Sequence, residues 1–90
     1  MESRVNGVDA MRAVVTVSLK DGVLDPQGKA IEHALHNLGF GNVAEVRAGK
    51  VITFLIDEGD AASAKAQATE MARRLLANTV IERFDVEVHP

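Results

Sequence analysis

Hydrophobic and polar residues alternate along residues 12–20, and this period of two predicts a β-strand with one buried face. After this strand the apolar positions change to helical spacing. Pro26 stands at the first helical position, where its missing N–H costs nothing, and Asp25 directly before it can cap the helix. Apolar residues then recur at helical spacing as far as Leu38, and Gly39 can end the helix in the left-handed conformation. The chain is organised around this strand-to-helix corner.

The next part of the chain predicts two strands joined as a hairpin. Residues 42–47 alternate between apolar and polar positions, which predicts a short strand. A tight turn at 48–50 leads into residues 51–56, which are apolar on both faces except at Thr53, as in a strand at the centre of a sheet. We interpret these two segments as neighbouring antiparallel strands.

A second helix and a last strand complete the pattern. Asp60 can cap a helix whose alanine-rich apolar stripe runs to Leu75. Asn78 is placed to end this helix in the left-handed conformation. Residues 80–89 alternate again, which predicts a further strand.

The predicted order of elements is therefore βαββαβ. Two right-handed β-α-β crossovers favour an α+β, ferredoxin-like fold, in which two helices lie on one face of a four-stranded antiparallel sheet. The other face of that sheet is uncovered, and the strand 51–56 has too many apolar residues for both of its faces to be wet. We expect a homodimer or a larger assembly, with Phe54 at or next to its interface.

Length and composition limit the class of protein. Residues 11–90 are enough for one domain, and residues 1–10 show no period and are expected to form a flexible N-terminal arm. The net charge of -3 argues against a surface for nucleic acid or for an anionic membrane. The absence of cysteine excludes a disulfide framework and a thiol nucleophile. No apolar run is long enough to span a bilayer, so we expect a soluble, cytoplasmic protein.

Candidate chemical groups are few. His33 and His36 are three residues apart on one helix, close enough to share a metal ion with His89, but no carboxylate at the matching turn completes a site. Since no Ser/His/Asp arrangement is found either, we assign no catalytic, cofactor-binding or metal-binding residue. Arg47 and Lys50 flank the predicted turn and are either solvated charges or contacts to an anionic partner.

Three blocks of sequence together indicate a family. They are Leu24-Asp25-Pro26-Gln27-Gly28, Val46-Arg47-Ala48-Gly49-Lys50 and Leu75-Leu76-Ala77-Asn78-Thr79-Val80-Ile81-Glu82. In this order and at this spacing they resemble PurS, the small subunit of bacterial and archaeal phosphoribosylformylglycinamidine synthase. The likeness covers residues 11 to about 89. The segments 1–10 and 61–68 depart from the family pattern without touching these blocks.

The resemblance implies a role in purine biosynthesis, in a complex that converts formylglycinamide ribonucleotide, glutamine and ATP into the formylglycinamidine. In that family the glutaminase subunit PurQ and the ATP-dependent synthetase subunit PurL are separate chains. The small subunit forms dimers, bridges these two chains and can help ammonia to pass between their active sites. It has no known catalytic residue and no cofactor of its own, while ATP and Mg are expected in the synthetase subunit.

The last block suggests a contact with the synthetase subunit. Glycine would end the second helix at least as well as Asn78, so the side chains of Asn78 and Thr79 are available for the backbone of a partner. The competing interpretation of Asn78 is a helix end and nothing more.

Two other classes of protein share this order of elements. A ligand-sensing regulatory module of the ACT type binds amino acids at the loop between its first strand and first helix. In this chain that loop holds Pro26 and two aspartates instead of a glycine-rich turn, which counts against such a module. The other class is a dimeric scaffold without a role in a pathway.

Overall fold

The computed structural model describes residues 4–5 and 8–90. It contains strands, two α-helices and one π-helical turn, in the order β1 (Arg4–Val5), β2 (Val8–Asp9), β3 (Met11–Leu19), α1 (Pro26–Asn37), β4 (Gly49–Ile56), α2 (Ala61–Met71), η1 (Ala72–Leu76) and β5 (Glu82–His89). The α+β class with an antiparallel sheet and two helices is confirmed. Of the predicted N-terminal arm, residues 1–3 and 6–7 lie outside the described residues, while β1 and β2 pair with each other.

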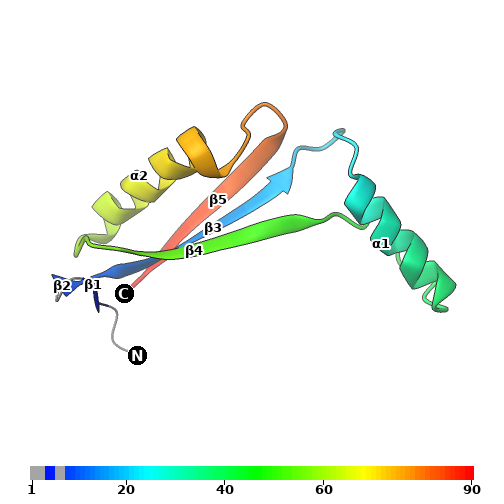
Figure 1. The fold of residues 1–90 in the computed structure, drawn as a ribbon, viewed down its shortest axis with the longest axis horizontal. Coiled ribbons are helices and arrows are strands. Elements are labelled where there is room, and N and C mark those ends of the chain that lie inside the picture. The colour runs from blue at the N-terminus through cyan, green and yellow to red at the C-terminus, as the bar shows by residue number, and fades with distance from the viewer. Residues whose placement is uncertain (1–3, 6–7) are drawn as a thin grey trace.

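The main sheet has the order β4-β3-β5, and both pairings are antiparallel. The central strand β3 places Ala13, Val15 and Val17 on its buried face, as the alternation predicts. Helix α2 covers this inner face above β3 and β5 (Figure 1). The core consists of residues from the sheet, from η1 and from the position after η1, namely Val15, Val17, Ala72 and Ala77, with Ile52, Phe54, Leu76, Phe84 and Val86 packed around them.

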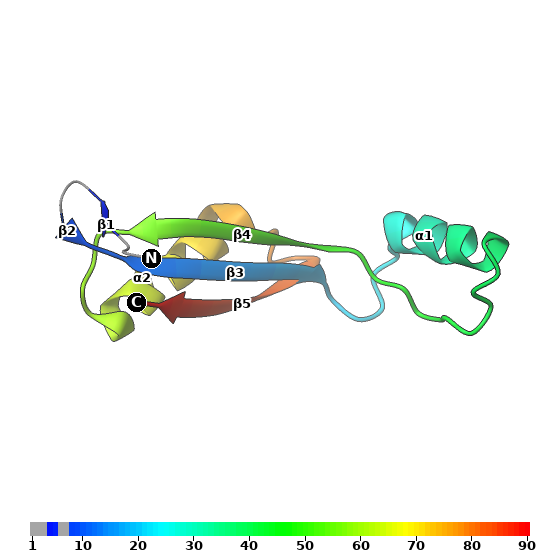
Figure 2. The same cartoon turned by 90° about the horizontal axis from the view of Figure 1, so that it is seen from below.

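Helix α1 does not cover the sheet. It lies beyond the end at which β3 stops and β4 starts, and both views show it separate from α2 (Figures 1 and 2). The prediction of two helices on one face is therefore wrong within a single chain. The chain is correspondingly long, with extents of 50 × 31 × 17 Å and a radius of gyration of 16.9 Å, whereas a compact domain of this length has a radius of about 12 Å.

The predicted strand over residues 42–47 is also absent, and with it the hairpin. This segment returns from α1 toward the sheet, and its backbone groups at Val43 and Val46 bond to side chains of α1 instead of to another strand. Glu45 has a φ of 54°, which interrupts an extended strand. The expected tight turn at 48–50 is replaced by the start of β4 at Gly49.

The ends of α1 follow the sequence prediction. Gly39 has a φ of 101°, the Phe40 N–H donates to the Leu35 carbonyl at 2.9 Å, and the Gly39 N–H donates to the His36 carbonyl at 3.0 Å. These are the two bonds of a Schellman ending. No helix in the described part of the chain is long and apolar enough to cross a membrane.

The end of the second helix differs from the prediction. Asn78 is not in the left-handed conformation. Instead, α2 continues into the π-helical turn η1, and the chain leaves it through Ala77, which is extended with a φ of -124° and a ψ of 142°. Because an extended residue already redirects the chain toward β5, no left-handed residue is needed there.

Candidate assembly surface

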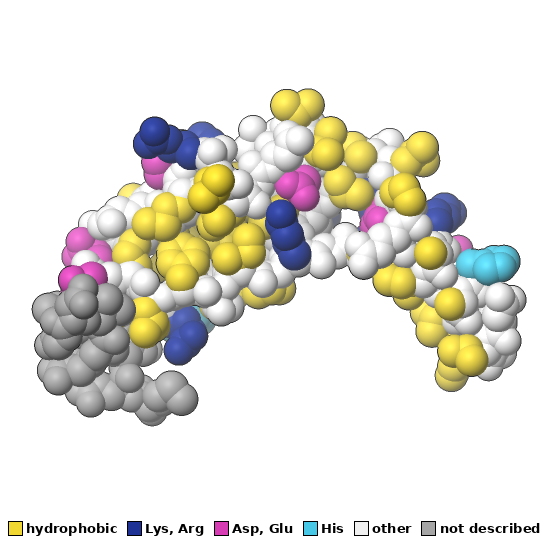
Figure 3. Space-filling model, viewed as in Figure 1, with side chains coloured by type: hydrophobic (Ala, Val, Ile, Leu, Met, Phe, Trp, Pro, Cys, Tyr) yellow, Lys and Arg dark blue, Asp and Glu magenta, His cyan; other side chains and the backbone are white. Residues whose placement is uncertain are grey.

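The apolar side of α1 is largely unburied. Leu38 is 74% exposed, Phe40 is 54% exposed and Ile31 is 41% exposed. Figure 3 shows hydrophobic side chains along the side of α1 that faces under the arch of the molecule. An isolated helix of 12 residues is only marginally stable in water. This helix therefore depends on contacts other than its own backbone bonds.

Part of that support comes from the segment that returns beside it. We call residues 22–48, which contain α1 and this returning segment, the helix arm. Asp25 is 6% exposed and accepts two hydrogen bonds, from the Gly28 N–H to Oδ1 at 2.8 Å and from the Ala48 N–H to Oδ2 at 2.7 Å. The sequence predicts the first bond, which caps α1, but not the second, which fastens the end of the returning segment to the start of the helix.

Two more side chains of α1 bind the same segment. Glu32 Oε1 accepts a hydrogen bond from the Val46 N–H at 3.1 Å, and His36 Nε2 donates to the Val43 carbonyl at 2.8 Å. These contacts join residues that are 14 and 7 positions apart in the sequence. No periodic pattern of residue types predicts contacts at such separations. Together with Asp25, they make the helix arm one connected unit.

Acid is expected to loosen the helix arm. The N–H groups of Gly28 and Ala48 hold the pKa of the Asp25 carboxyl below its ordinary value, and the Val46 N–H lowers the pKa of Glu32 in the same way. Both carboxylates thus stabilise the fold above their ordinary pKa of roughly 4. This contribution is lost as the pH falls through the lower pKa values of the folded chain.

Thermal unfolding between pH 7 and pH 2 tests this expectation. The midpoint should change little from pH 7 to pH 5 on account of these two groups and should fall below about pH 4. Glu32→Gln should have a lower midpoint at pH 7 and a smaller fall in acid than the unchanged chain. An equal fall in both proteins would contradict a role for Glu32 in the acid response.

A second apolar area lies on the sheet. Helix α2 packs on β5 and β3, so the inner face above β4, with Ile52 and Phe54, is only half-buried. Figure 3 shows hydrophobic side chains gathered between α2 and β4. Met71 on α2 and Leu75 on η1 are exposed as well. We call the inner face above β4 the uncovered inner face.

The outer face of the sheet is more polar. Thr16 of β3 stands between Val51 of β4 and Asp85 of β5, and the next position places Val14 between Thr53 and Glu87. Phe54 lies on the opposite, inner face, across from Ala13. The larger apolar surface is therefore on the helix arm and the uncovered inner face.

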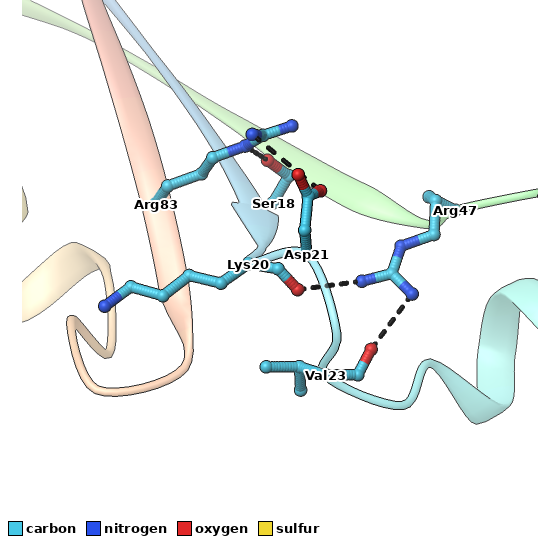
Figure 4. A network of polar contacts seen from close by, with 6 residues as sticks. All are labelled: Ser18, Lys20, Asp21, Val23, Arg47 and Arg83. Atoms are coloured by element: carbon cyan, nitrogen blue, oxygen red, sulfur yellow. Dashed lines mark hydrogen bonds and ion pairs between the residues drawn. The ribbon is translucent and has the colours of Figure 1, made fainter.

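Arg47 and Lys50 occupy different surroundings. Arg47 is not merely solvated, because its guanidinium donates to the Val23 carbonyl at 2.9 Å and to the Lys20 carbonyl at 3.2 Å. Figure 4 shows this arginine reaching across to the turn that leaves β3. Lys50 is exposed on β4, opposite Val17.

Asn78 and Thr79 lie together in the exposed corner between η1 and β5. The Asn78 side chain is partly used within the corner, since its Oδ1 accepts a hydrogen bond from the Val80 N–H at 3.2 Å. The Asn78 N–H donates to Glu82 Oε1 at 2.6 Å. The structure thus places Asn78 and Thr79 together in this corner, whereas Arg47, Lys50 and Phe54 lie in β4 or just before it. Within the described residues, no cluster of three or more metal-binding side chains is found.

The family model for PurS, described as phosphoribosylformylglycinamidine (FGAM) synthase, matches residues 12–90. This chain belongs to the PurS family. PurS is a subunit of FGAM synthase, the ligase complex of purine biosynthesis, and the three blocks of the sequence analysis all fall inside the matched region. The resemblance found from the sequence is confirmed.

Relatives and solved structures agree with this assignment. The PurS subunit of Bacillus subtilis is 47% identical over 74 residues, which cover 82% of this chain and 87% of the relative. That of Methanocaldococcus jannaschii is 40% identical over 77 residues, covering 86% and 93%. The crystal structure of the Methanocaldococcus jannaschii PurS, described as one subunit of formylglycinamide ribonucleotide amidotransferase, has a TM-score of 0.79 at 42% identity and covers 88% of this chain and 95% of that one.

A second solved structure has the same fold. The PurLQS structure of Thermotoga maritima matches with a TM-score of 0.82 and covers 91% of this chain and all of that one. Its 24% identity supports the fold alone.

Proposed function

We propose that this chain is the non-catalytic small subunit of an FGAM synthase, that it acts as a homodimer, and that it bridges the synthetase PurL and the glutaminase PurQ. The observation that carries the proposal is the unburied apolar side of α1, held away from its own sheet in a member of the PurS family. In this position the apolar side of the helix gains little burial within its own chain and is available for contact with another chain.

In the proposed dimer, the two copies exchange their helix arms. The helix α1 of each copy lies on the uncovered inner face of its partner, where the ferredoxin-like fold would place a second helix. The returning segment 42–47 then lies beside the edge strand β4 of the partner, at the place of the fourth strand in a ferredoxin-like sheet. Supporting this, β4 is an edge strand with one side of its backbone unpaired by the main sheet.

The surface area supports the same proposal. The chain has an accessible surface of 6272 Å², against roughly 5,100 Å² for a compact monomer of this length. A stable interface buries about 800 Å² on each partner. The accessible surface of the whole chain exceeds that of a compact monomer by an amount of this order.

In the proposed complex, ATP and Mg belong to the PurL subunit, and this chain holds no cofactor. The chain keeps the glutaminase and synthetase sites in register, so that ammonia released at the first reaches the second. The proposed location of the complex is the cytoplasm. The alternative amino-acid-sensing module gains no support, because the Asp25 carboxylate in the corner is already bonded to two backbone groups.

Asn78 and Thr79 are proposed contacts to PurL, with Lys50 as an additional polar contact. The support for Asn78 and Thr79 is their exposure at a corner that lies outside the helix arm and belongs to a block by which the family is recognised, and the support for Lys50 is its exposure on β4. Thr79→Val keeps the size of the side chain and removes its hydroxyl, and it spares the Asn78 bond to the Val80 N–H. Weaker capture of PurL with an unchanged unfolding midpoint supports the contact, and unchanged capture contradicts it for Thr79.

Reconstitution tests the proposed function. The purified chain alone is expected to hydrolyse neither glutamine nor ATP. When PurL and PurQ of the same organism are mixed with formylglycinamide ribonucleotide, ATP and Mg, glutamine-dependent formation of the formylglycinamidine should require the chain. Ammonia at high concentration should replace glutamine without PurQ, which separates a failure of the bridge from a failure of PurL. Full glutamine-dependent turnover without the chain would overturn the proposal.

A further inference from the structure

We infer that Arg47 is a positioning residue that sets the direction in which α1 leaves the sheet, and that it thereby favours docking of α1 on a second copy over docking on its own sheet. The partner is a second copy of this chain, so the inference rests on the proposed dimer. It assigns to Arg47 a role within the chain instead of a contact to an anionic partner.

The backbone connects the helix arm to the sheet where β3 leads out and where β4 leads back in. The exit is a turn over residues 20–23, closed by a hydrogen bond from the Val23 N–H to the Lys20 carbonyl at 3.1 Å. Gly22 has a φ of 86°, as the third residue of a type II turn requires. The turn is therefore a defined structure and not a free linker.

The sheet holds this turn from the other side. The Lys20 N–H donates to the Ile81 carbonyl at 2.8 Å, just before β5. Arg83 of β5 donates from Nε to Ser18 Oγ at 3.3 Å, and its Nη1 lies 4.0 Å from Asp21 Oδ1 (Figure 4). These contacts fix the position of the exit turn relative to the sheet.

Arg47 connects the entrance to this turn. It stands two residues before β4, and its two terminal nitrogens bond to the carbonyls of Val23 and Lys20, one at each end of the turn (Figure 4). The guanidinium is planar and its donors have a fixed spacing, so both bonds form together only over a narrow range of directions. Asp25 then ties Ala48 to the start of α1. This chain of contacts passes the direction of the turn on to the helix.

Without Arg47, the helix arm keeps the hydrogen bonds made by Asp25, Glu32 and His36 but loses its tie to the turn. An arm that rotates about the exit turn can place α1 on its own uncovered inner face, as in an ordinary ferredoxin-like fold. Exchange of an identical element between copies depends on such a balance between packing within and packing between chains. Removing Arg47 should therefore stabilise a closed monomer relative to the dimer.

The experiment measures the direction of α1 inside one chain. Since the chain has no cysteine, His33→Cys on α1 and Glu87→Cys on the outer face of β5 allow spin labels at two defined positions. Doubly labelled chains are diluted tenfold or more into unlabelled chains, so that the measured distance is within one copy. The same labels are introduced with Arg47→Ala, with Arg47→Lys and with Lys65→Ala, which removes one exposed positive charge from α2.

The unsubstituted chain and Lys65→Ala should give one long distance. Arg47→Ala should add a second, shorter distance and raise the dimer dissociation constant about tenfold, which corresponds to ~1.4 kcal/mol. Arg47→Lys should resemble Arg47→Ala, because a lysine keeps the charge but not the fork of donors. A contact of Arg47 with an anionic partner would instead leave Arg47→Lys nearly normal.

The outcomes separate this inference from the proposed function. If Arg47→Ala keeps the single long distance, Arg47 does not set the direction of α1 and the inference is overturned, whatever happens to the dimer. If the unsubstituted chain is a monomer at micromolar concentration, the proposed dimer fails, and the inference that Arg47 selects between partners fails with it. Circular dichroism of each variant identifies any loss of fold, and a shorter distance in a folded variant supports the inference.

Discussion

Replacing Leu38 by Asp is expected to convert the proposed dimer into a monomer. Leu38 is 74% exposed in the single chain, at the end of the apolar side of α1. Burying a leucine stabilises an interface by about 1.5 to 3 kcal/mol, and a two-fold symmetric dimer contains the residue twice. The dimer dissociation constant should therefore rise at least a hundredfold, as measured by sedimentation between nanomolar and millimolar concentrations.

His33→Asp is the matched control for Leu38→Asp. It adds the same negative charge to the same helix, but His33 faces away from the apolar side and is already exposed. Its effect on the dissociation constant should stay within about threefold, as expected of a surface substitution. Equal weakening by the two variants would show that charge on α1, and not its apolar side, controls association.

Gly28→Ala is expected to destabilise the chain by about 1 to 3 kcal/mol, the usual cost of forcing a methyl group into a packed site. A Cβ at this position would collide with the Val46 carbonyl oxygen and would lie 2.8 Å from Asp25 Oδ2. The returning segment must then move away from α1. The bonds of Asp25 to the Ala48 N–H and of Glu32 to the Val46 N–H are both at risk. Urea unfolding measures the loss.

Gly41→Ala provides the comparison for this substitution. It lies in the same helix arm, has no atoms within 4 Å of an added Cβ and has no positive φ. Its free energy of unfolding should change by less than about 0.5 kcal/mol. Hydrogen exchange of the Val46 and Ala48 amides should accelerate in Gly28→Ala and not in Gly41→Ala. Unchanged exchange in Gly28→Ala would mean that the close contact with Val46 is not what holds the segment in place.

Strand β3 and the helix arm show which kinds of structure a periodic pattern can predict. The alternation of residues 12–20 and the capping residues Asp25 and Gly39 act through near neighbours, and the structure confirms each of them. The alternation of residues 42–47 is equally clear, yet no strand forms. Alternation indicates which positions share a face but not which partner bonds to the backbone, and in this chain the partners are the side chains of Glu32 and His36.

The second helix gives a similar lesson at its end. The buried stripe is predicted correctly at Ala64, Ala68 and Ala72, which have no exposed surface. Leu75, the next position of the stripe, is 83% exposed, and Leu76 packs against the core in its place. The π-helical turn takes more residues per turn than an α-helix and so rotates the stripe by about one position. Nothing in the spacing of the apolar residues signals such a turn.

The candidate surface residues could be proposed from sequence only by their type and family block. Arg47 illustrates the limit, because its two acceptors are backbone carbonyls 24 and 27 residues away. Every residue has a backbone carbonyl, so the sequence does not indicate which carbonyl accepts the hydrogen bond of a given side chain. The structure alone connects this arginine to the exit of β3.

The order of strands in the sheet has a consequence for synthesis and folding. The central strand β3 is made early, and one of its two neighbours, β5, contains the last strand residues of the chain. On the ribosome, β3 can pair with β4 before β5 has been made, so its second neighbour is the last to become available. Contacts between such distant segments slow folding, since a long loop must close first. A chain that has been made only as far as β4 therefore exposes one edge of its central strand, and the sheet is completed only when residues 82–89 have left the ribosome.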